Sequence, residues 1–153
     1  MSDFQFPGES HGFWEFLCVD KGEVTVTAQD MRYVLRRGQM IFHQPYEFHT
    51  VEANGVIAPN LVVISFCCDS PAMDFFKNGI VSITEAEKSL LASVITEARQ
   101  AFSSRLDDPY LKELKRRPNQ CLSLIHISIK SASPLSATWA FSWIYSSIVD
   151  NSL

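Results

Sequence analysis

Two short segments of this chain carry residues whose types could form a polar or metal-binding site. His11 and Glu15 lie in the first segment, and His49 ends the second, which begins at Gly38. Both segments fall in β-rich sequence with alternating apolar residues. Because successive strand residues face opposite sides of a sheet, His11, Phe13 and Glu15 share one face. The spacing therefore predicts that two imidazoles and one carboxylate meet inside a small β-barrel.

The residues alone leave three interpretations of this cluster open. A buried histidine can be hydrogen-bonded to a carboxylate with no ligand involved. The same groups can contact a small polar ligand, or they can coordinate a divalent cation. If a metal is held, its ligands are His11, Glu15 and His49, which leave open positions on Fe(II), Mn or Zn. We predict ligand contacts at His11, Phe13, Glu15 and His49, with no catalytic residue, no metal and no cofactor.

Residues near this cluster in the sequence also fit structural roles that involve no ligand. The aromatic side chains around the cluster, Phe13 included, also suit core positions. Two positions are open for His43, one flanking the barrel mouth and one on the surface away from it, and we predict the surface position; Arg36-Arg37 fits a solvated turn.

The composition is that of a soluble globular protein with one domain. The chain has 153 residues, of which 46% are hydrophobic and 20% charged. The net charge of −4 argues against a nucleic-acid-binding surface. The cysteines form no CxxC pair, and the first residues contain neither a basic nor an apolar run, so we expect reduced thiols and no signal peptide. The predicted localisation is cytoplasmic.

Period-two alternation and regularly spaced turns predict a β-rich first half. The predicted strands cover residues 13–19, 23–28, 31–35, 39–43, 49–53 and 60–68. Short strands at this spacing are typical of a sandwich or small barrel.

The second half is predicted to be helical. Ser70-Pro71 can cap a short helix that runs to Lys77. Thr84 and Glu87 form a capping box before a longer helix. This helix has one apolar stripe, composed of Leu90, Leu91, Val94, Ile95, Ala98 and Phe102. The stripe can face either the outer wall of the barrel or the same helix of a second subunit. Residues 110–117 are predicted to form one more short helical segment.

Two motifs resemble those of the cupin superfamily. The first is His11-x3-Glu15-x6-Gly22. The second runs from Gly38 to His49, with a proline four residues before the histidine, and resembles the AraC-type form. Residues 33–42 resemble the strand–turn–strand between the motifs, and residues 70–117 resemble the helical extension of AraC-type bacterial regulators. The resemblance covers residues 4–118.

The resemblance implies a mainly-β cupin barrel, a double-stranded β-helix or jelly roll, followed by two or three helices. The implied domains are a cupin barrel over 1–69, its helical extension over 70–118 and an atypical tail over 119–153. The implied function is effector sensing and dimerisation for an AraC-type transcription regulator. The implied partners are a small polar molecule such as a sugar and a second copy of the chain. DNA would be bound only through a helix-turn-helix domain that this chain lacks. The alternatives are a metal-dependent cupin enzyme, of dioxygenase or sugar isomerase type, and a stand-alone binding cupin.

The sequence departs from the family in two places. Metal-binding cupins usually carry HxH before the glutamate, and here Glu9 and His11 occupy those positions. In residues 121–153 only Lys130 and Asp150 are charged, and residues 122–128 resemble translated transposase-adapter sequence. We therefore expect a truncated or out-of-frame C-terminus and no membrane span.

Overall fold

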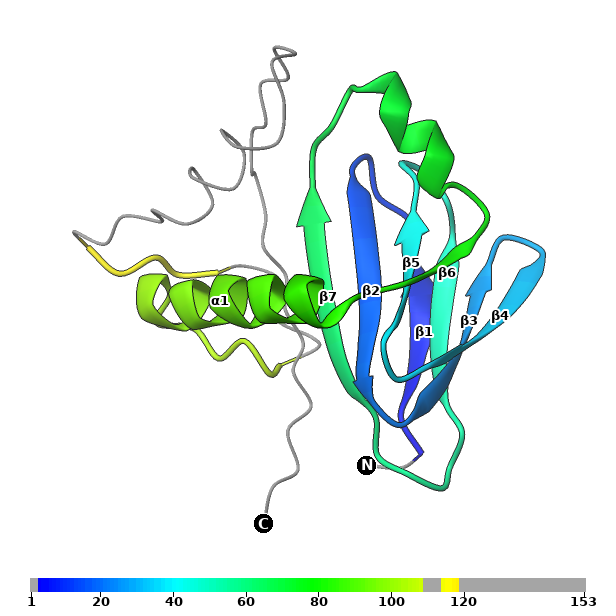
Figure 1. Ribbon diagram of the computed structural model, residues 1–153, viewed down its shortest axis with the longest axis horizontal. Helices are drawn as coiled ribbons and strands as arrows, with labels where there is room; N and C mark the ends of the chain where they lie inside the picture. Colours follow the sequence, from blue (N-terminus) through cyan, green and yellow to red (C-terminus); the bar gives the residue numbers. More distant parts are fainter. Residues whose placement is uncertain (1–2, 109–113, 119–153) are drawn as a thin grey trace.

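Two four-stranded antiparallel sheets face each other and enclose the interior of the molecule (Figure 1). The computed structural model describes residues 3–108 and 114–118. The first sheet has the order β1-β6-β3-β4, with bounds β1 Gln5–Glu9, β6 His49–Ala53, β3 Glu23–Ala28 and β4 Met31–Arg36. The second has the order β7-β2-β5-β8, with bounds β7 Asn60–Phe66, β2 Trp14–Lys21, β5 Gln39–His43 and β8 Ile80–Ser82. The mainly-β fold predicted from the sequence is confirmed.

Two of the strands were not predicted, and both lie at sheet edges. β1 contains Pro7 and Gly8, which are unfavourable inside a strand but tolerated at an edge or a bulge. Gly8 has φ +105°, and the register between β1 and β6 shifts between Phe6 and Glu9. This irregularity places Glu9 opposite His49. β8 has three residues and pairs with β5, so the second sheet includes a strand from beyond residue 69.

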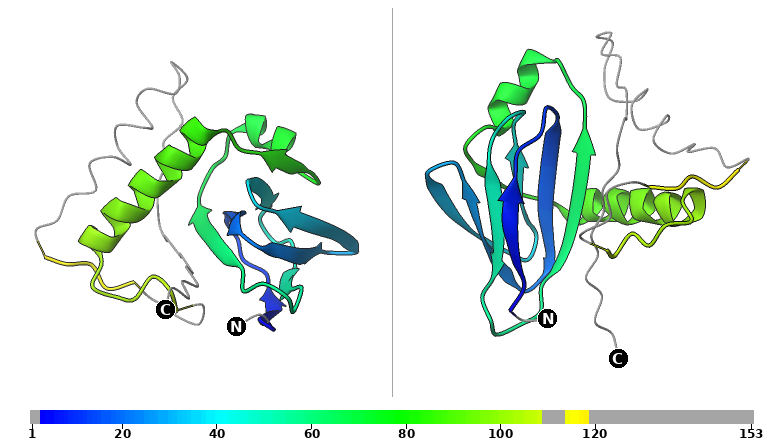
Figure 2. Two further views of the ribbon diagram at one scale, coloured as in Figure 1. Left: turned by 60° about the horizontal axis from the view of Figure 1, so that its bottom comes forward. Right: turned by 180° about the vertical axis from the view of Figure 1, so that it is seen from behind.

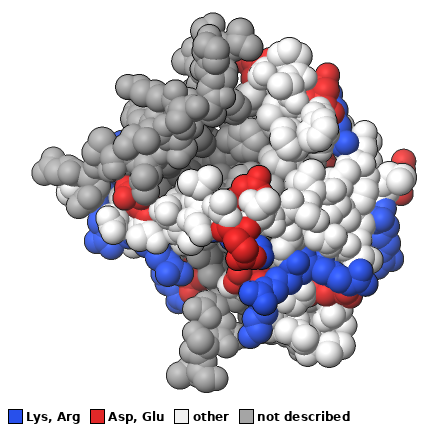
Figure 3. Space-filling model, viewed as in Figure 1, with Lys and Arg blue, Asp and Glu red and all other residues white. Residues whose placement is uncertain are grey.

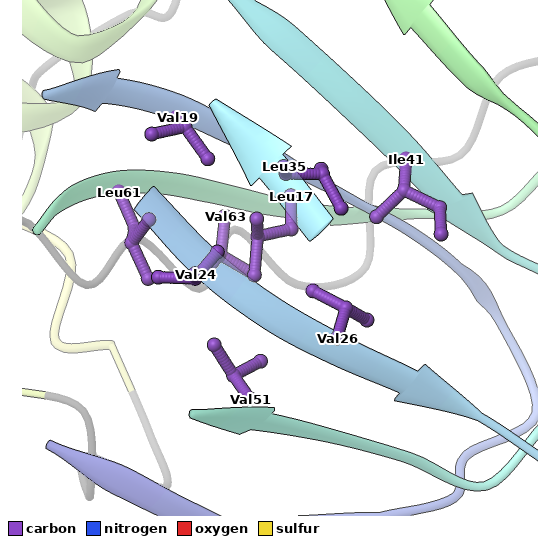
Figure 4. Close-up of a cluster of buried hydrophobic side chains, with 9 residues drawn as sticks. All are labelled: Leu17, Val19, Val24, Val26, Leu35, Ile41, Val51, Leu61 and Val63. Atoms are coloured by element: carbon purple, nitrogen blue, oxygen red, sulfur yellow. The ribbon is translucent and has the colours of Figure 1, made fainter. Parts of the chain in front are cut away.

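The space between the sheets is filled by an aliphatic cluster drawn from both (Figure 4). The alternation predicted for β3 is present, with Val24 and Val26 fully buried. Along β2, Leu17 and Val19 face this interior, whereas Cys18 belongs to a second cluster on the outer face of the sheet. Each strand of the second sheet is thus apolar on both faces, as expected for a sheet covered on both sides.

The longer helix, α1 (Glu85–Ala101), covers that outer face. Its capping box is present: the Thr84 side chain accepts from the Glu87 backbone, and the Glu87 carboxylate accepts from the Thr84 backbone. The part of the predicted stripe that packs on the outer cluster is Leu91, Val94 and Ile95. Figures 1 and 2 show α1 starting against the sheet and extending past its β7 edge. Of the two orientations open from sequence, the described residues show the one against the barrel wall.

The shorter helix is a 3-10 helix, Pro71–Phe76, and Ser70 caps it as predicted. The predicted third helical segment lies partly outside the described residues. Its described end is not helical, so that part of the prediction is wrong: Arg116 pairs with Phe102 in an isolated β-bridge, and Arg117 N–H donates to the Ala101 carbonyl at 2.7 Å. The described residues 116 and 117 thus pair with the end of α1 and are not helical.

The surface carries charges of both signs. On the face shown in Figure 3, Lys and Arg side chains lie beside Asp and Glu side chains. Arg36 pairs with Glu23 at 2.8 Å and Arg32 with Glu52 at 3.2 Å. Within the described residues, no helix combines the length and apolar character needed to span a bilayer. The predicted tail, residues 119–153, lies outside the described residues.

Candidate ligand-binding site

The predicted site residues meet at one end of the barrel interior. Glu15 lies on β2 with its side chain on the same face as Leu17, and the register places it opposite His43 on β5 and Ser65 on β7. His49 begins β6 on the facing sheet. The interior is therefore aliphatic over most of its length and polar at this end.

Glu15 is the centre of the cluster. Its carboxylate lies 3.2 Å from His49 Nε2 and 3.5 Å from His11 Nε2, and it accepts a hydrogen bond from the Ser65 hydroxyl at 2.9 Å. The residue is only 4% exposed. Burial alone would raise the pKa of Glu15, but the adjacent imidazoles of His11 and His49 outweigh it and lower the pKa to about 2. Glu15 is therefore an anion throughout the physiological range.

Backbone carbonyls orient the two predicted histidines. His11 Nδ1 lies 3.0 Å from the Phe13 carbonyl, and His49 Nδ1 lies 3.1 Å from the Glu47 carbonyl. Because a carbonyl oxygen only accepts hydrogen bonds, Nδ1 is the donor in both rings. The two Nε2 atoms are thereby directed toward Glu15.

Phe13 makes two contacts with the His11 imidazole. Its carbonyl accepts from Nδ1, and its ring stacks on the imidazole with centroids 3.9 Å apart and planes 8° apart. Burial would lower the pKa of His11, but the neighbouring carboxylate of Glu15 outweighs it and the pKa is raised. Phe13 is half-buried beside the cluster, and its ligand role stays a prediction.

Glu9 completes a group that fits a divalent cation. Glu9, His11, Glu15 and His49 each offer one donor atom, and these atoms lie within 4.8 Å of one another. Burial, followed by the charge of Glu15, raises the pKa of Glu9. The Nε2 atoms of His11 and His49 are buried without an aligned hydrogen-bond partner among the described residues. Metal-ligating imidazoles are commonly held through Nδ1 with Nε2 directed at the ion, so this donor set is compatible with a divalent cation.

His43 was wrongly predicted to be a surface residue. Its side chain is 0% exposed, Nδ1 lies 2.8 Å from the Glu47 carboxylate, and the ring stacks on His49 at 4.0 Å with planes 7° apart. Burial lowers the pKa of His43, only partly opposed by Glu47. The available signal was period two, because His43 shares the face of Ile41, which is buried in the core.

Glu47 and Ser65 were also missed. Glu47 is 5% exposed and lies in the connection between β5 and β6, where no periodicity applies. Ser65 is 2% exposed and shares its face with Val63. A serine in an otherwise aliphatic strand gives no signal until its partner, Glu15, is known.

Exposed residues lie in the connections between strands at this end of the barrel. Tyr46 N–H donates to the His11 carbonyl at 2.7 Å, which joins the β5–β6 connection to the β1–β2 connection. Tyr46 is 79% and Phe48 50% exposed, and Glu9 is exposed as well. The cluster is thus buried at Glu15 and His49 and exposed to solvent at Glu9, with two exposed aromatic side chains nearby.

A comparison with protein families agrees with this geometry. The family model described as AraC-like ligand binding domain matches residues 2–60, which run from the start of the chain to the first residue of β7. No curated protein matches the chain. Residues 2–60 are therefore similar to AraC-like ligand-binding domains, and the two facing antiparallel sheets agree with the cupin-type fold of that family.

Proposed function

We propose that this chain is the effector-sensing part of an AraC-type transcription regulator, and that a small polar ligand binds at the Glu15 cluster. One observation carries the proposal: the polar cluster lies at one end of the barrel, within the residues that match the AraC-like ligand binding domain. Three imidazoles and two buried carboxylates, those of Glu15 and Glu47, converge there. The Nε2 atoms of His11 and His49 lie beside Glu15 without an aligned hydrogen-bond partner among the described residues. Buried polar atoms without partners are uncommon, and a ligand with polar groups of its own would satisfy them.

The proposed mechanism is a population shift. A ligand that contacts His11, Glu15 or His49 prefers one arrangement of the segments that flank the barrel. That preference biases the orientation of a DNA-binding domain carried elsewhere in the regulator. Homodimerisation and a cytoplasmic location belong to the same proposal, since such regulators act as paired subunits on DNA. The sensor role requires no resident metal.

Ligand-dependent stabilisation tests the proposal. The protein is heated in the presence of neutral sugars, polyols and amino sugars, and each compound that raises Tm is titrated by calorimetry. We expect a compound that stabilises the wild type and that loses about tenfold or more in affinity in Glu15→Gln. The matched control is Glu23→Gln, which removes a carboxylate from β3, on the opposite side of the interior. Equal binding by the wild type and Glu15→Gln would place the ligand elsewhere.

A metal-dependent cupin is the second candidate, and the cation-compatible group of Glu9, His11, Glu15 and His49 favours it. Those four residues would hold the ion, which would supply Lewis acidity to a bound oxygen atom. Elemental analysis of the purified protein separates the candidates. For the sensor we expect much less than one metal ion per chain, with no change in His11→Ala or His49→Ala. One ion per chain in the wild type, lost in both variants, would favour the enzyme.

A further inference from the structure

Glu47 holds two histidines as one unit. Its carboxylate contacts His43 Nδ1 at 2.8 Å, while its backbone carbonyl contacts His49 Nδ1 at 3.1 Å. The two rings are nearly parallel, with planes 7° apart and centroids 4.0 Å apart. Because both rings are held at Nδ1 by the same residue, both direct the opposite edge, which carries Nε2, away from Glu47.

The proton positions follow from these contacts. A carboxylate and a carbonyl oxygen accept hydrogen bonds, so each imidazole donates from Nδ1. In a neutral imidazole, Nε2 then carries a lone pair and acts as an acceptor. His43 Nε2 is buried and has no hydrogen-bond partner among the described residues.

The surroundings of His43 offer no donor to this atom. Its cross-strand neighbour is Glu15, an acceptor, and the nearby Ser65 hydroxyl donates to Glu15. His49, stacked on His43, directs an Nε2 of its own toward Glu15. Among the described residues, His43 Nε2 therefore has no donor, and an acceptor left without a donor in a buried site costs free energy.

His43 does not belong to the group that can hold a cation. The mutually close donor atoms come from Glu9, His11, Glu15 and His49. A metal ion at that group would leave His43 Nε2 unpartnered, so a metal alone does not complete the site. A molecule that extends past the group toward β5 would.

We infer that His43 is a specificity-determining residue, whose Nε2 accepts a hydrogen bond from a hydroxyl or N–H group of the ligand, so that the site selects neutral or cationic donor-bearing molecules over carboxylates. This inference rests on the proposed sensing function. It also narrows the range of ligands left open by the sequence, because a ligand carboxylate would face the Glu15 anion and the His43 lone pair with no hydrogen to donate.

Pairs of probes that differ in one group test the selection. D-galactose is compared with D-galacturonate, and D-glucose with D-glucuronate and D-glucosamine, by ligand-observed NMR and calorimetry. We expect the neutral or amino member of each pair to bind more tightly than its acid. His43→Phe keeps an aromatic ring on His49 and removes Nε2, so affinity should fall about tenfold. The control is Tyr33→Phe on β4, which removes one polar atom from an aromatic ring, where His43→Phe removes two, and should leave affinity unchanged.

A second measurement does not depend on the variant folding. The ¹⁵N spectrum of the histidine rings in the wild-type protein reports which nitrogen carries the proton. We expect His43 to carry it on Nδ1, and Nε2 to shift when a binding probe is added. Tighter binding of the acids, unchanged affinity in folded His43→Phe, or a proton on His43 Nε2 would overturn the assignment of His43 and leave the sensing function standing. If none of the probes binds, both the assignment and the sensing function are contradicted.

Discussion

Glu15 links the stability of the barrel to pH. Its pKa is lowered from 4.5 to about 2 in the folded protein, because His11 and His49 outweigh the effect of burial. A carboxylate with a depressed pKa stabilises the folded state above its unfolded pKa and loses that contribution as pH falls through the folded value. The contribution is roughly 3 kcal/mol at neutral pH, from the size of the shift.

We therefore predict that Glu15→Gln unfolds more readily than the wild type at neutral pH, and that the difference shrinks as pH falls from about 4.5 to about 2. Denaturant unfolding of both proteins at a series of pH values measures it. A difference that stays constant over this range would show that the paired imidazoles do not set the charge of Glu15.

Glu47 is predicted to be a structural residue of the same cluster. Glu47→Ala removes the carboxylate that accepts from His43 and leaves a buried N–H without a partner, which costs about 1–3 kcal/mol in unfolding free energy. Glu47→Gln keeps an oxygen that accepts from the same N–H, so it should retain most of the stability. Denaturant unfolding of the two variants makes the comparison. Equal loss in both would mean that charge, rather than the hydrogen bond, holds His43.

Among individual residues, the sequence predicted those that the two-residue strand period and the motif spacing bring together. His11, Glu15 and His49 do meet at one end of the interior. Glu9 was placed only through the family resemblance, because its position opposite His49 depends on a register shift between Phe6 and Glu9 that the strand period does not reveal. Glu47 lies in a connection, where side-chain direction follows local backbone geometry rather than a period.

Among the elements, the strands bounded by glycine or proline turns were the most predictable. β3, β5 and β6 have the predicted bounds, and the capping box fixed the start of α1. β1 and β8 were missed because one contains Pro7 and Gly8 and the other has three residues, which is too short to show a period. Both form only because a neighbouring strand offers free backbone groups.

The packing of α1 against the barrel gives a prediction with an internal control. Leu91 packs on the outer cluster, whereas Leu90, the preceding residue, is 58% exposed. Leu91→Ala should cost about 1–3 kcal/mol in unfolding free energy, because it removes partly buried apolar contacts. Leu90→Ala should cost less than about 0.5 kcal/mol.

Denaturant unfolding followed by circular dichroism compares the two variants, and sedimentation tests association. A large loss in Leu90→Ala, together with a change of oligomeric state, would instead indicate that this side chain is covered by a second subunit.

For the whole molecule, the aliphatic interior and the polar cluster are complete within residues 3–108. A chain that ends at Pro118 should therefore unfold cooperatively, with a midpoint close to that of the 153-residue protein. Differential scanning calorimetry of the two chains tests this. Loss of a cooperative transition in the shorter chain would make residues 119–153 a structural part of the domain.

The fold as a whole was predictable because its pattern repeats: short strands, regular turns and alternating burial all indicate paired sheets. What the sequence could not provide was the pairing partner of each edge strand. That choice depends on contacts between residues far apart in the chain, such as Ile41 of β5 and Ile80 of β8.

The paired strands β5 and β8 connect the polar cluster to α1 through a short stretch of hydrogen-bonded backbone. β5 ends at His43 and is hydrogen-bonded along its other half to β8, and Ile83 N–H donates to the Gly38 carbonyl at 2.9 Å. The helix cap, Thr84, follows immediately. Sliding of β5 along its axis would therefore displace the start of α1, with no flexible linker between them to absorb the movement. The same strand thus connects His43 inside the barrel directly to the start of the helix outside it.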